Sequence, residues 1–140
     1  MAKSVLLDTG VLIALLRNLP GVKEFMKRLA SEATLLVSAV TVVEIWQGAR
    51  PVEMEKTRLL FEALKVIPLD ENLAEQAGQL AGQLRQSGIT IGLADTVIAA
   101  TGIQTKAPII TTNPKHFTLI SELVVRDLRE ELAPYLLGPW

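Results

Sequence analysis

Cysteine is absent from the 140-residue chain, and histidine occurs only once, at position 116. Without cysteine the protein has no disulfide, no zinc site built from thiolates and no cysteine nucleophile. With one histidine it has no metal site built from several imidazoles. Carboxylates are the side chains that remain for metal binding and for acid–base catalysis.

An excess of either charge is also lacking, since 14 Lys and Arg residues are balanced by 15 Asp and Glu residues, a formal net charge of −1. This excludes the global basicity of a protein that coats nucleic acid, so any nucleic-acid partner must be held locally. The apolar run in residues 1–16 is interrupted or bounded by Lys3, Asp8 and Arg17, and it is far shorter than the roughly 20 residues of a membrane span. It also lacks the basic start of a secretory signal. We expect no membrane partner and a cytoplasmic location.

Apolar material, in contrast, is plentiful: hydrophobic residues make up 49% of the chain and charged residues 21%. This is enough to bury a core without disulfides, and the length fits one ordinary domain. We therefore expect a single domain over residues 1–140, with a C-terminal tail from about 127 to 140. The apolar end of this tail is expected to pack on a dimer partner, on another protein or back on its own core.

Short apolar runs alternate along the chain with longer segments of helical periodicity. The predicted strands are residues 3–7, 34–38, 66–69, 108–112 and 123–126, and the predicted helices are residues 9–18, 20–32, 42–49, 52–64, 71–86 and 93–105. Parallel strands need crossover connections, and helices supply them. The alternation therefore predicts the α/β class, with a central parallel sheet flanked by helices. Ligands bind such sheets beyond the carboxyl ends of the strands.

Three carboxylates lie in unusually apolar surroundings. Asp8 ends the first predicted strand, Glu44 lies inside the sequence VVEIW, and Asp95 lies inside LADTVI. A buried carboxylate is costly unless a cation or hydrogen bonds compensate it. Each also has a simpler explanation, because Asp8 and Asp95 can cap helices and Glu44 can complete a capping box with Thr41. Since topology brings all three toward one end of the sheet, we expect them to form one acidic site.

Carboxylates that lie within a few ångströms of one another repel unless a hard divalent cation binds them. Mg²⁺ or Mn²⁺ is the natural occupant of such a site. A metal held in this way can activate water and stabilise charge on a phosphodiester. The three carboxylates therefore predict hydrolysis of phosphodiester bonds.

Four motifs follow one another along the chain: LLDT at residues 6–9, SAVTVVE at 38–44, GITIGLADTVIAA at 88–100 and TTNPKHF at 111–117. Together they resemble the PIN domain, in particular the VapC-type toxins of prokaryotic toxin–antitoxin pairs, over roughly residues 5–125. The resemblance implies a parallel α/β fold and a Mg²⁺- or Mn²⁺-dependent endoribonuclease. It also implies a homodimer and inhibition by a small antitoxin, on which the C-terminal tail could pack.

The family's functional positions transfer to this chain residue by residue. Its three acids correspond to Asp8, Glu44 and Asp95, and the hydroxyl after the first acid corresponds to Thr9. Where many PIN domains have a fourth acid, this chain has Asn113, whose amide oxygen can bind a metal but adds no charge, so a second metal should bind more weakly. The resemblance thus gives Asp8, Glu44, Asp95 and Asn113 as the catalytic and metal-binding residues, supported by Thr9, Thr111 and Thr112.

Contacts with phosphate need cationic donors near the acidic site. The candidates are Arg50, Arg85, Lys106, Lys115 and His116, and each has the alternative role of a solvated surface charge. Asn113 leaves one other function open, that of a PIN-like module that binds RNA or a protein without cutting. The triplet Asp8-Thr9-Gly10 is also typical of a retroviral-type aspartic protease, a minor alternative. Such a protease is almost entirely β, whereas long segments here have helical periodicity, and it would leave Glu44 and Asp95 unexplained.

Overall fold

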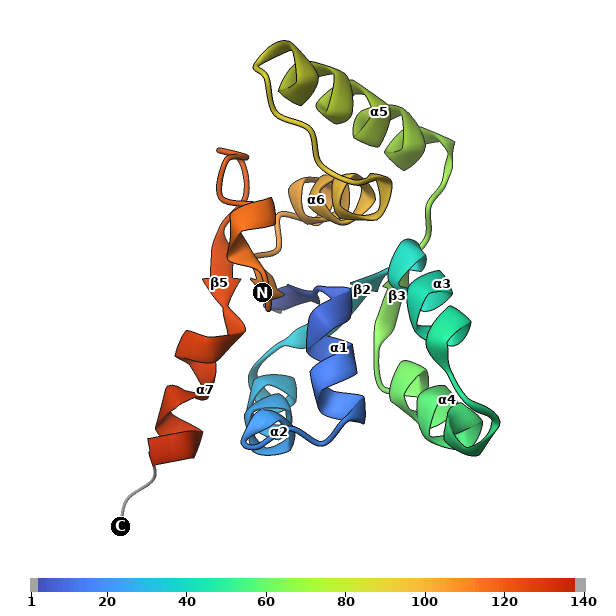
Figure 1. Ribbon diagram of the computed structural model, residues 1–140, viewed down its shortest axis with the longest axis vertical. Helices are drawn as coiled ribbons and strands as arrows, with labels where there is room; N and C mark the ends of the chain where they lie inside the picture. Colours follow the sequence, from blue (N-terminus) through green and yellow to red (C-terminus); the bar gives the residue numbers. More distant parts are fainter. Residues whose placement is uncertain (1–2, 138–140) are drawn as a thin grey trace.

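A sheet of five parallel strands forms the centre of the protein within residues 3–137, the part of the chain that the computed structural model describes (Figure 1). The strands are β1 (Ser4–Leu7), β2 (Thr34–Ser38), β3 (Lys65–Ile67), β4 (Ile109–Thr111) and β5 (Val125–Asp127). Their order is β3-β2-β1-β4-β5. The chain builds outward from β1 on one side and then on the other, so the strand order reverses between β1 and β4, where α/β proteins bind ligands. The predicted parallel sheet is confirmed.

Helices connect the strands and cover both faces of the sheet. They are α1 (Thr9–Leu16), α2 (Val22–Glu32), α3 (Ala39–Gly48), α4 (Met54–Glu62), α5 (Glu71–Gln86), α6 (Leu93–Thr105) and α7 (Leu128–Leu137), with short 3₁₀ turns η1 (Pro51–Glu53) and η2 (Pro114–His116). In Figure 1, α5 and α6 lie above the sheet and α1, α2 and α4 below it. Within residues 3–137, no helix combines the length and apolar character needed to cross a membrane.

Two apolar clusters hold these layers together. Val5 and Leu7 of β1 belong to a core shared with α1, α2 and α7, whereas Leu6 belongs to a core shared with α5 and α6. This alternation follows from the period of two in a strand, whose successive side chains enter opposite faces of the sheet. Phe117, which follows η2, is fully buried in the second core. A strand buried on both faces explains the uninterrupted apolar run before Asp8.

The tail that the sequence left without a predicted element forms helix α7. Leu128 and Leu132 are buried in the core, and the ring of Tyr135 meets Phe25 of α2 edge-on, with 6.0 Å between ring centroids. The described part of the tail therefore packs on its own chain. The remainder of the predicted tail, residues 138–140, lies outside the described residues.

The aspartic-protease alternative is wrong. That alternative requires an almost entirely β protein, and here helices cover both faces of a parallel sheet. Asp8-Thr9-Gly10 is instead the junction between β1 and α1.

Candidate active site

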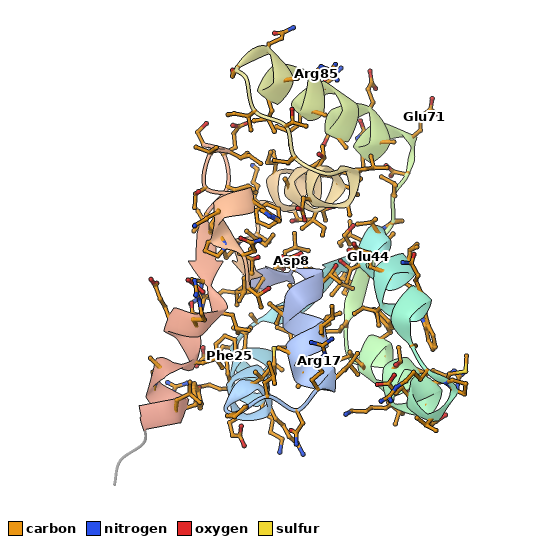
Figure 2. The ribbon with its side chains drawn as sticks, in the orientation of Figure 1. Asp8, Arg17, Phe25, Glu44, Glu71 and Arg85 are labelled. Atoms are coloured by element: carbon orange, nitrogen blue, oxygen red, sulfur yellow. The ribbon has the colours of Figure 1, made fainter. Side chains whose placement is uncertain are left out.

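Asp8 occupies the junction between β1 and α1, at the end of the central strand (Figure 2). It is the N-cap of α1, and its Oδ1 accepts a hydrogen bond of 2.8 Å from the backbone N–H of Thr9. Its Oδ2 accepts a hydrogen bond of 2.7 Å from Thr111 Oγ1, which lies at the end of the adjacent strand β4. Only 7% of the residue is exposed. The predicted capping role is confirmed, and the carboxylate is fixed through both oxygens.

Burial raises the pKa of the Asp8 carboxyl above its ordinary value of 3.8. The hydrogen bonds from Thr111 and Thr9 act in the opposite direction, and the negative charges of Asp95 and Glu44 raise the pKa of Asp8 further. These two acids are thus close enough to repel Asp8. Among residues 3–137, no lysine or arginine forms an ion pair with Asp8. Within the described residues, no basic side chain therefore balances the buried carboxylate of Asp8.

Glu44 reaches the site from α3. Its Oε1 accepts a hydrogen bond of 2.6 Å from Thr9 Oγ1, which also lies 3.0 Å from Thr41 Oγ1. The capping box expected between Thr41 and Glu44 is wrong, because α3 begins earlier, with Ser38 as N-cap. Glu44 therefore lies more than one turn inside the helix. Its side chain accepts the hydrogen bond from Thr9, the residue after Asp8, and does not cap the start of α3.

Asp95 lies in the first turn of α6, which has Gly92 as its N-cap. Its Oδ2 lies 2.7 Å from Nδ1 of His116, and Nε2 of the same imidazole lies 2.8 Å from Nδ2 of Asn113. The backbone N–H of Asn113 donates to Thr111 Oγ1 over 2.9 Å. Residues of the turn after β4 thus connect Asp95 to Thr111, whose hydroxyl contacts Asp8. His116 was predicted to contact the substrate, but both of its ring nitrogens contact other residues of the protein.

The candidate phosphate contacts are scattered. Arg50 pairs with Glu53, and Lys115 is exposed on η2 beside the site. Arg85 lies on the outer helix α5, far from Asp8 in Figure 2. Lys106 caps the opposite end of α6 from Asp95, about 16 Å away along the helix axis at 1.5 Å per residue. Of these four side chains, Lys115 adjoins His116, which contacts Asp95, and Arg50 lines the same groove as Glu44.

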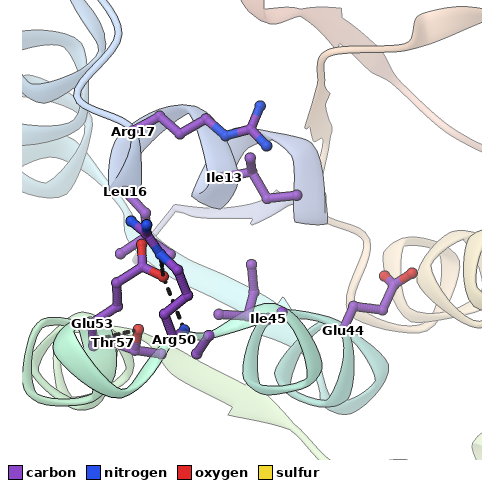
Figure 3. Close-up of a pocket in the computed structure, with 10 residues that line it drawn as sticks. Ile13, Leu16, Arg17, Glu44, Ile45, Arg50, Glu53 and Thr57 are labelled. Atoms are coloured by element: carbon purple, nitrogen blue, oxygen red, sulfur yellow. Dashed lines mark hydrogen bonds and ion pairs between the residues drawn. The ribbon is translucent and has the colours of Figure 1, made fainter.

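A groove of about 350 Å³ runs from Glu44 along α1 (Figure 3). Ile13, Leu16 and Arg17 of α1 line one wall, and Ile45 and Arg50 line the other. Apolar side chains and the carboxylate of Glu44 therefore line the same groove.

Comparison with known proteins identifies the fold family. The family model of the PIN domain matches residues 5–123. The chain belongs to the PIN-domain family. It is 31% identical over 119 residues to "Ribonuclease VapC10" of Mycobacterium tuberculosis, covering 85% of this chain and 90% of that protein. It is also 31% identical over 119 residues to "Ribonuclease VapC1" of Methanocaldococcus jannaschii, covering 84% of this chain and 82% of that protein.

A solved relative has the same fold. The structure of VapBC-1 from nontypeable Haemophilus influenzae superposes on this PIN domain with a TM-score of 0.77 and 28% sequence identity, covering 91% of this chain and 99% of that one. The resemblance to the PIN family inferred from the four sequence motifs is therefore confirmed.

The donor set of the PIN domain suits a hard divalent cation, because it consists of carboxylate, hydroxyl and amide oxygens. Within residues 3–137, no three acidic or histidine side chains converge closely enough to bind one ion in their present orientations. Glu44 is turned to Thr9, and Asp95 is turned to His116. Burial and the neighbouring acids raise the pKa of the Asp8 carboxyl, and a divalent ion would offset this cost of its negative charge.

Gly10 permits the close approach of α1 to the end of β4. A Cβ at this position would lie 2.1 Å from Thr112 Oγ1 and 3.3 Å from Thr112 Cβ. We expect Gly10→Ala to lower the free energy of unfolding in urea by about 1–3 kcal/mol, the usual cost of overpacking. Adding Thr112→Ala should recover most of the lost free energy of unfolding. As a control, Gly78→Ala, whose methyl group meets nothing within 4 Å on α5, should raise stability by about 0.5–1 kcal/mol. A Gly10→Ala protein as stable as the wild type would contradict the close approach.

Asp8 also makes stability depend on pH. Because its pKa is higher in the folded protein than in the unfolded chain, ionised Asp8 costs stability, and this cost disappears as the pH falls through the folded-state pKa. An asparagine at this position does not ionise. The free energy of unfolding of Asp8→Asn minus that of the wild type, measured in EDTA, should therefore be largest near pH 8 and shrink toward pH 4. Exposed Glu130→Gln reports the effect of removing one surface charge. A difference for Asp8→Asn that stays constant with pH would contradict the raised pKa.

Proposed function

We propose that this PIN-domain protein is a Mg²⁺- or Mn²⁺-dependent endoribonuclease, the toxin of a toxin–antitoxin pair, and that it acts as a homodimer. The observation that carries the activity is the buried Asp8 carboxylate, repelled by Asp95 and Glu44. A group of carboxylates in this condition favours a divalent cation. The family match and the ribonuclease names of the relatives support RNA as the substrate.

The protein's own residues divide the work of binding the ion. Asp8 is the rigid ligand, because Thr9 and Thr111 hold its two oxygens. Asp95 contributes Oδ1, which has no hydrogen bond or ion pair within residues 3–137. Glu44 is exposed and accepts a hydrogen bond from Thr9 through Oε1. A divalent ion bound here would activate water and stabilise charge on the scissile phosphodiester.

Asn113 and the neighbouring cations complete the proposed site. The amide oxygen of Asn113 is a neutral ligand, so it binds a second ion less strongly than a carboxylate. Lys115 on η2 and Arg50 at the groove are the cations that we assign to phosphate contacts of the RNA.

An antitoxin is the partner that the relatives suggest, since the Haemophilus structure is described as VapBC-1 and related structures as toxin–antitoxin complexes. We assign it to the groove of Figure 3. This groove begins at Glu44, and Ile13, Leu16 and Ile45 provide apolar area along it. A protein segment seated there would bury apolar surface and cover a carboxylate of the proposed active site at the same time.

Cleavage of a labelled total-RNA preparation tests the proposed activity. The wild type should cut RNA in Mg²⁺ or Mn²⁺ and stop in EDTA, Asp95→Asn should lose cleavage, and Glu130→Gln on α7 should keep it. Equal cleavage by wild type and Asp95→Asn would mean that the carboxylates are not responsible. Folded wild type that cuts no RNA with either metal would contradict the proposal and favour a PIN module that binds without cutting.

A further inference from the structure

A continuous series of contacts connects Asp8 to Asp95 through residues at the end of β4 and in the turn that follows it. Thr111 Oγ1 donates to Asp8 Oδ2 over 2.7 Å, and the backbone N–H of Asn113 donates to Thr111 Oγ1 over 2.9 Å. Asn113 Nδ2 lies 2.8 Å from His116 Nε2, and His116 Nδ1 lies 2.7 Å from Asp95 Oδ2. The turn after β4 thus links the end of β1 to the first turn of α6.

The contacts of His116 favour one position for its proton. The amide nitrogen of Asn113 can only donate, so Nε2 of the imidazole must accept. The ring proton of the neutral imidazole is then on Nδ1, where it faces Asp95 Oδ2. A proton on Nε2 would instead place two donors against each other and would bring the lone pair of Nδ1 against a carboxylate oxygen.

We propose that His116 is a positioning residue for the metal site. It holds Asp95 Oδ2 through Nδ1–H, and Asn113 fixes the imidazole from the other side, so that Asp95 presents Oδ1 to the ion. Residues that orient a metal-binding carboxylate in this way commonly change metal affinity by tenfold or more when they are replaced. This role rests on the proposed function, because it assumes that Asp95 binds the ion. It replaces the assignment of His116 to the substrate, since both ring nitrogens are already engaged.

Two substitutions test the two contacts of the imidazole separately. In His116→Asn the amide nitrogen can take the place of Nδ1 and still donate to Asp95. In His116→Gln the amide takes the place of Nε2, so the contact with Asn113 can form and the contact with Asp95 is lost. Mn²⁺ affinity, followed by the electron paramagnetic resonance of free Mn²⁺, should fall by about tenfold or more in His116→Gln and stay close to wild type in His116→Asn. Circular dichroism checks that both variants fold.

The position of the proton can be measured without metal. His116 is the only histidine of the chain, so the imidazole nitrogens give one pair of ¹⁵N resonances. In metal-free protein at alkaline pH, these resonances should show the proton on Nδ1. A proton on Nε2 would overturn the positioning role, because Nδ1 could then not donate to Asp95.

The outcomes also separate this inference from the proposed function. Weaker Mn²⁺ binding in His116→Gln, with binding kept in His116→Asn, supports the positioning role. Equal affinities in the wild type and both variants would overturn it while metal-dependent RNA cleavage by the wild type still supported the proposed function. If the wild type neither binds Mn²⁺ nor cuts RNA, the proposed function fails and the positioning role fails with it.

Discussion

Replacing Asp8 by asparagine is expected to reduce metal-dependent RNA cleavage by at least about a hundredfold, because metal activation contributes several kcal/mol to such reactions. The same variant should be at least as stable as the wild type at pH 8 in EDTA. Burial and the charges of Asp95 and Glu44 raise the pKa of Asp8, so removing its charge relieves a cost to the folded state. RNA cleavage and the melting temperature of the same preparations measure the two effects.

Loss of cleavage without loss of stability would show that the Asp8 carboxylate serves the reaction and not the fold. If Asp8 were only the N-cap of α1, Asp8→Asn would retain cleavage, since asparagine caps helices about as well as aspartate. Glu130→Gln, which removes an exposed carboxylate from α7, should change neither property by much. Full cleavage by Asp8→Asn would contradict the role of Asp8 as a metal ligand.

Thr111→Val is expected to lower the free energy of unfolding by about 2–3 kcal/mol. The buried hydroxyl donates to the Asp8 carboxylate and accepts from the backbone N–H of Asn113, and valine, although similar in shape, provides neither interaction. A hydrogen bond to a charged group contributes about 1.5–3 kcal/mol, and leaving its partner unsatisfied adds to the loss. Urea denaturation at neutral pH measures the change.

Thr111→Ser is the matched control, because it removes a methyl group and keeps the hydroxyl. It should lose clearly less stability than Thr111→Val. The two variants should also differ in the pH dependence of cleavage. The hydrogen bond from Thr111 lowers the pKa of Asp8, so the acid limb of the pH–rate profile should move to higher pH in Thr111→Val alone. Equal stabilities of the two variants would contradict the importance of this hydroxyl.

The fold follows from local signals in the sequence more directly than the site does. The predicted bounds of α5 and α6 match the structure. For α5 the signals are local, namely apolar residues at helical spacing, the N-cap Asp70 and the stop at Ser87-Gly88. Helix α7 was not predicted, and it contains Pro134, a residue that is rare inside helices. Its position depends on packing against α2, which sequence periodicity does not report.

The acidic residues of the site were predicted from their apolar neighbours, but their partners were not. The pattern from Thr41 to Glu44 fits a capping box, yet Ser38 caps α3, and the partner of Glu44 is Thr9, 35 positions earlier. The pairing of Asp95 with His116 likewise depends on the path of β4. Tertiary contacts of this kind leave little trace in one sequence. The spacing of three positions between Asn113 and His116, across Pro114, was the only local signal that these two side chains meet.

Thermal unfolding in increasing Mn²⁺ tests the central claim most directly, namely that Asp8, Glu44 and Asp95 hold a divalent ion. A ligand that binds only the folded state stabilises it, by about 2.7 kcal/mol at a hundred times its dissociation constant. The melting temperature of the wild type should therefore rise with Mn²⁺, whereas that of Asp8→Asn should stay constant. An unchanged melting temperature of the wild type up to millimolar Mn²⁺, or an equal rise in Asp8→Asn, would contradict the account.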